Sequence, residues 1–150
     1  MGRVNLHATV VVIGAIGVLI RGPSGAGKST LALKLVDLAT ARNRFAMLVA
    51  DDQTWISRHG GRLVARVPES IAGLIEHRGY GPVRVAHEPG AVVDRIVTLI
   101  DAAEVPRVHT GLVSEIESIR LPELRLAGCG FASAATVVAW LDDRDLVLDS

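Results

Sequence analysis

The chain has 150 residues, of which 49% are hydrophobic and 3% aromatic, and its 16 basic and 16 acidic residues balance. This length suits a single domain over residues 1–150 with a core built from Val, Leu, Ile and Ala. The zero net charge argues against a nucleic-acid partner, and the longest apolar run, Val10–Ile20, is too short to cross a membrane.

A single cysteine, Cys129, excludes an intramolecular disulfide and has no metal-ligand spacing around it. We expect it to be a small, buried or half-buried residue of a protein in a reducing, cytoplasmic compartment. The first residues lack the basic and apolar segments of a signal peptide.

The first elements form a strand, a turn, a second strand and a helix. Val4–Ile13 is rich in β-branched residues and predicts a strand, and Val18–Ile20 predicts another after the turn Gly14–Gly17. Two strands joined by so short a loop are antiparallel. The glycine-rich Gly22–Ser29 then opens a helix predicted over 29–39, whose leucines give it a broad apolar face.

The later elements are shorter. We expect a buried strand over 47–50, a hairpin of 53–57 with 62–67 around Gly60-Gly61, and a short helix or turn over 68–75. The remaining expectations are a loop over 79–82, a strand over 92–100, short strands over 116–120 and 124–127 around Pro122, a helix over 132–141 and a solvated, charged tail over 142–145.

The segment Gly22–Ser29 reads G-P-S-G-A-G-K-S and matches the phosphate-loop pattern G-x-x-x-x-G-K-[ST]. Glycines let backbone N–H groups converge on phosphate oxygens, and the start of a helix favours an anion. Lys28 supplies a charge to the outer phosphates, Ser29 supplies a hydroxyl to Mg²⁺, and the hydroxyl of Ser24 could face the terminal phosphate. The residues predicted to bind ATP are Gly22, Pro23, Ser24, Gly25, Ala26, Gly27, Lys28, Ser29 and Thr30.

Two acids, Asp51 and Asp52, end the apolar segment Leu48–Ala50. Carboxylates at the carboxyl end of a strand commonly face the ligand crevice of an α/β sheet. In phosphoryl transfer one acid can organise Mg²⁺ and the other can accept the proton of an attacking hydroxyl. His7 alone would be interpreted as a half-buried strand residue. The hairpin could, however, bring it beside Asp51 or Asp52, where a contact between the histidine and the acid would tune proton transfer.

The order of these motifs along the chain is more specific than the phosphate loop alone. Leu6-His7 comes fifteen residues before Gly22, followed by an apolar hairpin, G-x-S-G-x-G-K-S and then V-A-D-D. Downstream, Leu74–Gly81 reads L-I-E-H-R-G-Y-G and looks like the signature L-L-E-I-R-G-L-G. Together the motifs resemble the HPr kinase/phosphorylase family, well over residues 4–100 and loosely over the remainder.

The resemblance implies a mixed sheet with a phosphate loop, similar to phosphoenolpyruvate carboxykinase. It implies an ATP- and Mg²⁺-dependent kinase that phosphorylates a serine of HPr, or of a related phosphocarrier, and regulates carbon metabolism. A homo-oligomer, a hexamer in known members, is implied by the resemblance alone. Matched position by position, the implied catalytic residues are His7, Lys28, Asp51, Asp52, Arg78 and Arg107. Asp52 is the one that accepts the serine proton and returns it in the reverse reaction. The implied Mg²⁺ ligands are Ser29, Glu76 and Asp51.

The sequence also departs from the family. His77 stands where the signature usually has an apolar residue, and the N-terminal domain of many members is not present, as in a short form or an excised catalytic domain. The segment P-V-R-P-G-R, tied to dephosphorylation, corresponds to 127–131 here, which contains no arginine. Since anion donors are missing there, we expect kinase activity with weak or absent phosphorolysis.

Two other functions remain open. A small-molecule P-loop kinase would usually carry an arginine-rich lid and a parallel strand before the loop, and neither is clear in this sequence. A nucleotide-binding regulatory module without transfer activity is the second alternative.

Overall fold

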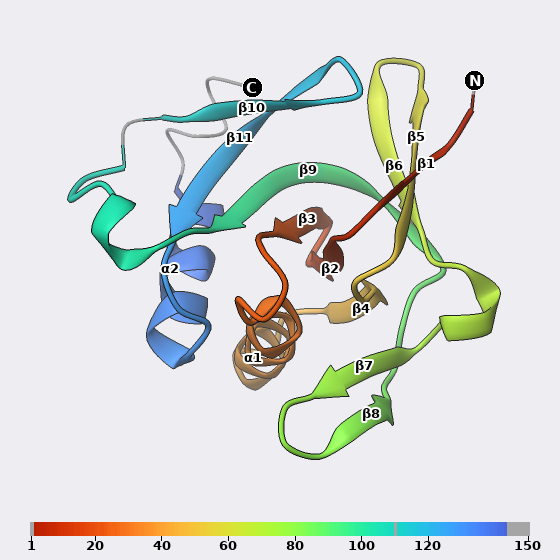
Figure 1. Ribbon diagram of the computed structural model, residues 1–150, viewed down its shortest axis with the longest axis horizontal. Coiled ribbons are helices and arrows are strands. Elements are labelled where there is room, and N and C mark those ends of the chain that lie inside the picture. Colours follow the sequence, from red (N-terminus) through yellow and green to blue (C-terminus); the bar gives the residue numbers. More distant parts are fainter. Residues whose placement is uncertain (1, 110, 144–150) are drawn as a thin grey trace.

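The computed structural model describes residues 2–109 and 111–143 and has a mixed α/β fold (Figure 1). Its strands are β1 Val4–Leu6, β2 Thr9–Ile13, β3 Ile16–Arg21, β4 Ala46–Ala50, β5 Thr54–His59, β6 Arg62–Arg66, β7 Leu74–His77, β8 Gly81–Arg84, β9 Gly90–Leu99, β10 Val113–Ile116 and β11 Ile119–Leu126. The described residues also form the α-helices α1 Lys28–Ala41 and α2 Phe131–Leu141 and the 3-10 helices η1 Glu69–Ile71 and η2 Ala102–Glu104.

A curled, mixed sheet carries the fold. Its strands follow the order β1-β5-β6-β9-β3-β2-β4, with β11 added to β9 and β10 to β11. β3 is parallel to β9 and β9 to β11, whereas β2 is antiparallel to both β3 and β4. The strands β3, β4, β9 and β11 therefore run in one direction, and their carboxyl ends lie at one edge of the sheet.

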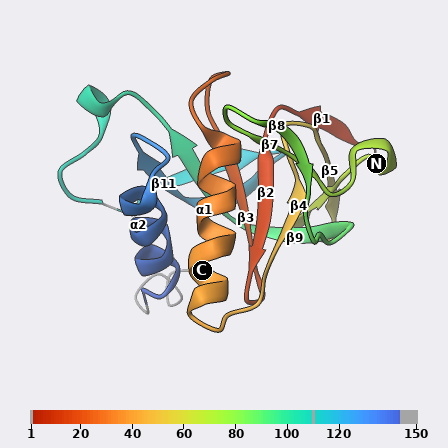
Figure 2. The same cartoon turned by 90° about the horizontal axis from the view of Figure 1, so that it is seen from below.

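Each face of the sheet buries its own core. Helices α1 and α2 lie side by side over one face (Figures 1 and 2). Leu31 and Leu35 of α1 and Val137 and Val138 of α2 join one core with Val18 of β3. The next residue of β3, Leu19, points to the opposite side and joins a second core inside the curl. Each large aliphatic side chain buried in this way stabilises the fold by about 1.5–3 kcal/mol. Among the described residues, no helix combines the length and apolar content that a bilayer span needs.

Several predicted elements are confirmed. β2 and β3 form the expected antiparallel hairpin that leads into the glycine-rich loop, and α1 begins at Lys28. β5 and β6 form the second hairpin around Gly60 and Gly61, whose φ angles of 55° and 79° suit a two-residue turn of type I′. Cys129 is half-buried, as expected.

The single strand predicted over 4–13 is wrong. The chain bends at His7, between β1 and β2. β1 pairs with β5, whereas β2 pairs with β3 and β4. The bend exists because the chain changes its pairing partner at this point, which the composition of the segment does not reveal.

The loop predicted over 79–82 is instead part of a small hairpin. Gly81–Arg84 forms β8 and pairs only with β7, in a two-stranded sheet separate from the main one. Leu74 and Ile75 therefore belong to a strand and not to the short helix or turn predicted over 68–75, of which only Glu69–Ile71 is helical. Ile75 is 2% exposed and joins the core beside α1, so tertiary packing holds this hairpin.

Pro122 lies inside β11 and does not separate two strands as predicted. Residues up to Pro122 pair with β10, and pairing with β9 starts at Glu123. Proline is tolerated in the part of a strand that lies at a sheet edge, because its missing N–H breaks no inner bond.

Candidate functional site

The glycine-rich loop between β3 and α1 is shaped to approach an anion. Gly25 and Gly27 have φ angles of 80° and 100°, in the left-handed region that favours glycine. A Cβ on Gly27 would lie 2.5 Å from Sγ of Cys129, so the space also demands glycine. Gly27 is the N-cap of α1 and has no side chain that could cap the helix. The first N–H groups of the helix are therefore left for another acceptor. Such a helix start binds phosphate oxygens.

The side chain of Lys28 is folded back over this loop. It is 8% exposed, and its Nζ donates hydrogen bonds to the carbonyl oxygens of Gly22 at 3.0 Å and Pro23 at 3.3 Å. An ammonium group has three donors and no acceptor. Lys28 can therefore exchange these carbonyl partners for phosphate oxygens without leaving the loop.

Asp51 links several elements at the carboxyl end of β4. Its Oδ1 accepts hydrogen bonds from Oγ of Ser29 at 2.6 Å and from Oγ1 of Thr9 at 2.9 Å. Its Oδ2 accepts from the backbone N–H of Glu76 at 3.0 Å. One carboxylate thus joins the start of α1, the start of β2 and the strand β7.

Asp52 is held differently from its neighbour. Its φ angle is 65°, a left-handed conformation that costs a non-glycine residue about 1–3 kcal/mol and that clusters at functional sites. Its backbone N–H donates to Oγ1 of Thr9 at 3.2 Å. Its exposed carboxylate makes no hydrogen bond or ion pair within the described residues. That carboxylate is therefore available to a ligand.

These groups line one cavity of about 390 Å³, which we call the phosphate pocket. The sequence-predicted loop, acids and signature segment come from three separate stretches of the chain and meet here. The lining residues are Ser24, Gly25, Gly27, Lys28, Ser29, Thr30, Asp51, Asp52, Glu76, Arg78 and Gly79.

Some predicted site residues lie elsewhere. His7 is exposed and lines a different cavity with Arg21 and Glu115. Within the described structure no hydrogen bond or ion pair joins His7 to Asp51 or Asp52, and Thr9 makes that contact instead. The bend at His7 turns this residue out of the strand that faces the acids.

Four further predicted residues are not among those that line the phosphate pocket. Arg107 is exposed in the loop after η2 and is not among the lining residues. Pro23 and Ala26 line a cavity on the other side of the glycine-rich loop. Gly22 lies at the root of the loop, where its carbonyl oxygen binds Lys28.

The donor set of the phosphate pocket fits Mg²⁺. Ser29, Asp51 and Glu76 bring only oxygen donors, which a hard cation prefers. The described residues contain no cluster of three or more His, Cys, Asp and Glu side chains able to form a complete metal cage. Mg²⁺ does not need one, because it usually takes one or two carboxylates and completes its shell with water and substrate phosphates.

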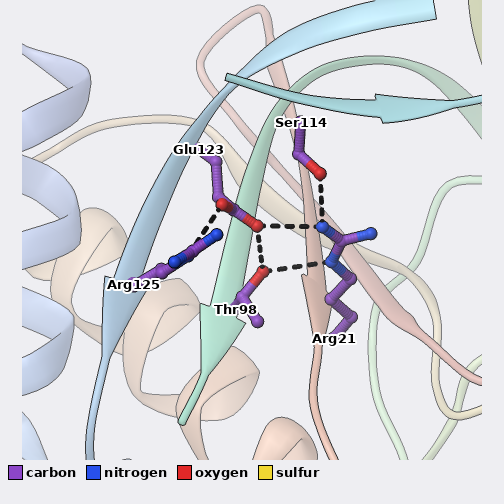
Figure 3. Close-up of polar contacts among 5 residues, drawn as sticks. All are labelled: Arg21, Thr98, Ser114, Glu123 and Arg125. Carbon is purple, nitrogen blue, oxygen red and sulfur yellow. Dashed lines mark hydrogen bonds and ion pairs between the residues drawn. The ribbon is translucent and has the colours of Figure 1, made fainter. Parts of the chain in front are cut away.

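A polar cluster around the buried Glu123 fixes the strand end that leads into the loop (Figure 3). Nη2 of Arg21 donates to Oε2 of Glu123 at 2.9 Å and to Oγ of Ser114 at 2.6 Å. Nε of Arg21 donates to Oγ1 of Thr98 at 3.0 Å, and Oγ1 of Thr98 donates to Oε2 of Glu123 at 2.7 Å. Nε of Arg125 donates to Oε1 of Glu123 at 3.0 Å. The residue before Gly22 is thereby tied to β9, β10 and β11.

The central acid of this cluster, Glu123, is 1% exposed. Burial pushes the pKa of Glu123 upward, but the hydrogen bonds from Thr98, Arg21 and Arg125 and the charge of Arg125 outweigh it, so the pKa lies below its ordinary value. The carboxylate form of Glu123 is therefore the form that the fold stabilises.

Sequence reasoning missed Thr9, Arg21 and Glu123. For Thr9 and Arg21 the available signal was a polar residue at the end of an apolar run, since Thr9 precedes V-V-V-I and Arg21 follows V-L-I. Such residues are buried only with partners. The partners could not be named, because they lie 42 to 102 positions away.

Comparison with known proteins points in one direction. Residues 2–101 match the model of the HPr Serine kinase C-terminal domain family. A curated HPr kinase/phosphorylase of Halalkalibacterium halodurans is 48% identical over 81 residues, 53% of this chain and 24% of that protein. One of Brevibacillus brevis is 40% identical over 98 residues, 65% of this chain and 30% of that protein.

The fold matches the solved structure of the Hpr(Ser) kinase/phosphatase from Coxiella burnetii with a TM-score of 0.81 and 23% sequence identity. The match covers 98% of this chain and 99% of the Coxiella burnetii chain. This likeness confirms the mixed α/β fold. The chain spans about a quarter of the length of the curated relatives it matches. Because the family model covers two thirds of its residues, the chain belongs to the HPr Serine kinase C-terminal domain family.

Proposed function

We propose that this chain is the catalytic domain of an ATP- and Mg²⁺-dependent protein-serine kinase that acts on HPr or a related phosphocarrier in the cytoplasm. One observation carries the proposal: the phosphate loop, three residues with oxygen donors suited to Mg²⁺ and the carboxylate of Asp52, which has no partner among the described residues, line a single cavity. Membership of the family supports the same reaction and the regulation of carbon metabolism as its purpose.

Each group has a task in the proposed reaction. The N–H groups at the start of α1 and the ammonium of Lys28 hold the outer phosphates and stabilise the charge of the transferring phosphoryl group. The Asp52 carboxylate accepts the proton of the serine hydroxyl as the new O–P bond forms and ADP leaves. Arg78 neutralises charge at the rim of the cavity, and Ser29, Asp51 and Glu76 hold Mg²⁺, which neutralises the bound phosphates.

We further propose that the reverse reaction with inorganic phosphate is weak or absent. Residues 127–131 supply no cationic side chain for a second phosphate. Incubating serine-phosphorylated HPr with inorganic phosphate and measuring pyrophosphate release tests this proposal. Robust release would overturn it and leave the kinase proposal intact.

Transfer of label from γ-labelled ATP separates the possible functions. With Mg²⁺ and purified HPr, we expect label on a serine of HPr and none on a variant in which that serine is alanine. Label on a metabolite would instead identify a small-molecule kinase. Nucleotide binding without transfer to any candidate would identify a regulatory module, and either result would contradict the proposal.

The family resemblance also leads us to propose a homo-oligomer, a hexamer by analogy. Sedimentation of the purified chain over a range of concentrations tests this. A monomer at all concentrations would contradict it.

A further inference from the structure

A second cavity of about 390 Å³ lies on the other side of the glycine-rich loop. Its walls are the loop itself, the end of β9 with the residues that follow it, and the residues that follow β11. The lining residues are Pro23, Ser24, Gly25, Ala26, Leu99, Ile100, Asp101, Ala102, Ala127 and Gly128. Ser24 and Gly25 also line the phosphate pocket, so the two cavities adjoin at the crest of the loop.

The sheet topology explains why a crevice forms here. β3, β9 and β11 are parallel, so their carboxyl ends open at one edge, where α/β folds bind ligands. β4, which is followed by Asp51, lies on the other side of β3, beyond β2. The loop after β3 therefore separates the phosphate pocket from the second cavity, and Figures 1 and 2 both show it between the β7–β8 hairpin and the β11–α2 connection.

The two cavities differ in the cations that they contain. The phosphate pocket contains the cations Lys28 and Arg78 beside the acids Asp51, Asp52 and Glu76, whereas Asp101 is the one ionisable residue among the described residues that line the second cavity. A carboxylate without a cation repels phosphate oxygens. The second cavity thus suits an uncharged group that carries hydroxyls, and carboxylates beside nucleotide sites commonly accept hydrogen bonds from ribose hydroxyls.

The shape of the second cavity suits a flat, weakly polar group. Its walls are backbone and small or apolar side chains such as Ala26, Leu99 and Ala127. Gly128, with a φ angle of 81°, turns the chain there, and the bond from Ile100 N–H to the Leu126 carbonyl at 2.8 Å holds the two strand ends together. The volume falls within the range of roughly 300–1,000 Å³ of small-molecule sites.

We propose that this second cavity binds the nucleoside half of ATP, with Asp101 accepting hydrogen bonds from the ribose hydroxyls. The triphosphate then crosses the crest at Ser24 and Gly25 and enters the phosphate pocket. The inference rests on the proposed function, because it assigns the other half of the same nucleotide.

Two ligands separate this inference from the proposed function. Titration calorimetry with Mg²⁺ measures the Kd of ATP, which fills both cavities, and of inorganic tripolyphosphate, which fills the phosphate pocket alone. Ala127→Leu narrows the second cavity and is expected to raise the Kd of ATP at least tenfold while the Kd of tripolyphosphate stays within twofold. Asp101→Ala, at an exposed position, is expected to raise the Kd of ATP by about three- to tenfold, the value of one or two hydrogen bonds.

Controls make the result unambiguous. Ala41→Leu adds the same side chain at an exposed position at the end of α1 and should change neither Kd. Thermal melting shows whether Ala127→Leu folds. If it does not fold, the Kd of ATP for Asp101→Ala tests the inference instead. Equal weakening of both ligands, or unchanged ATP binding in Asp101→Ala, would overturn the inference alone. Failure of the unaltered chain to bind either ligand would overturn the proposed function and the inference with it.

Discussion

Thr9 is the residue that holds the two adjacent acids of the site. Its hydroxyl donates to Asp51 Oδ1 and accepts from the Asp52 backbone N–H, and the residue is fully buried. It thus connects a carboxylate suited to the metal with the residue proposed as the general base. Its role follows from geometry alone, because a threonine in an apolar strand gives no chemical signal of its own.

Replacing Thr9 by Val removes both hydrogen bonds at nearly constant volume. We expect the free energy of unfolding to fall by about 1–3 kcal/mol, since the half-buried Asp51 Oδ1 loses one of its two hydroxyl donors and the backbone N–H of Asp52 loses its acceptor. Urea denaturation measures the change, and Thr9→Ser, which keeps the hydroxyl, should lose less than half as much. A Thr9→Val protein as stable as the parent would show that the hydroxyl contributes nothing.

Gly27 is constrained by both conformation and space. Gly27→Ala places a Cβ 2.5 Å from Cys129 Sγ and forces alanine to a φ angle of 100°, at a cost of about 1–2 kcal/mol for the conformation alone. We expect Mg²⁺–ATP affinity to fall at least tenfold in calorimetry. Adding Cys129→Ala should restore only part of it, because the strained φ remains. Full recovery in the double variant would mean that the thiol contact is the whole effect.

At the scale of elements, the small β7–β8 hairpin completes the phosphate pocket. It contributes Glu76, Arg78 and Gly79 from a sheet that is separate from the main one. It is positioned by the buried Ile75 and by the bond from Glu76 N–H to Asp51. An isolated hairpin is marginally stable, so these anchors decide where its polar side chains lie.

Glu76→Gln tests the part of this hairpin that is assigned to Mg²⁺. Loss of one negative ligand should raise the Mg²⁺ concentration needed for half-maximal phosphate transfer. The rate at saturating Mg²⁺ should fall by a smaller factor than the rate at low Mg²⁺. Glu69→Gln, on η1 and outside the pocket, is the matched control. If both variants require the same Mg²⁺ concentration as the parent, Glu76 is not a ligand.

The elements differ in how well the sequence predicts them. The β2–β3 hairpin, the phosphate loop and α1 were predicted because short-range signals, β-branched runs and glycine spacing, determine them. The bend at His7 and the β7–β8 hairpin were not, because pairing with β5 and packing beside α1 determine them. The same limit explains the site. The two acids and most motif residues of the loop line one cavity. His7 was expected beside the acids because of the hairpin, but the bend at this residue turns it away, and Arg107 was supported by the family resemblance alone.

At the scale of the whole molecule, the cluster around Glu123 joins β3, β9, β10 and β11 beneath the loop (Figure 3). Because the pKa of Glu123 in the folded protein is below its ordinary value of 4.5, the cluster stabilises the fold at neutral pH. That stability is lost as the pH falls from the ordinary value through the lowered pKa. The cluster therefore contributes to acid sensitivity of the whole fold.

Glu123→Gln removes the charge at the centre of the cluster. We expect a loss of about 2–3 kcal/mol of unfolding free energy at pH 7, because two arginines lose a charged acceptor. The variant should lose less additional stability than the parent as the pH is lowered below 4.5. Denaturation curves at a series of pH values measure this, with the exposed Glu104→Gln as control. Identical pH profiles of parent and Glu123→Gln would contradict the assignment.

The most direct test of the account compares phosphate transfer and ATP binding in Asp52→Asn. The substitution keeps the shape of the phosphate pocket and removes the proposed proton acceptor. We predict that transfer from Mg²⁺–ATP to the serine of HPr slows by about 10²–10⁴-fold in this variant, while its Kd for ATP changes less than twofold. The control Asp37→Asn, on the exposed side of α1, should transfer phosphate at the parental rate. Transfer at the parental rate by Asp52→Asn would contradict the account.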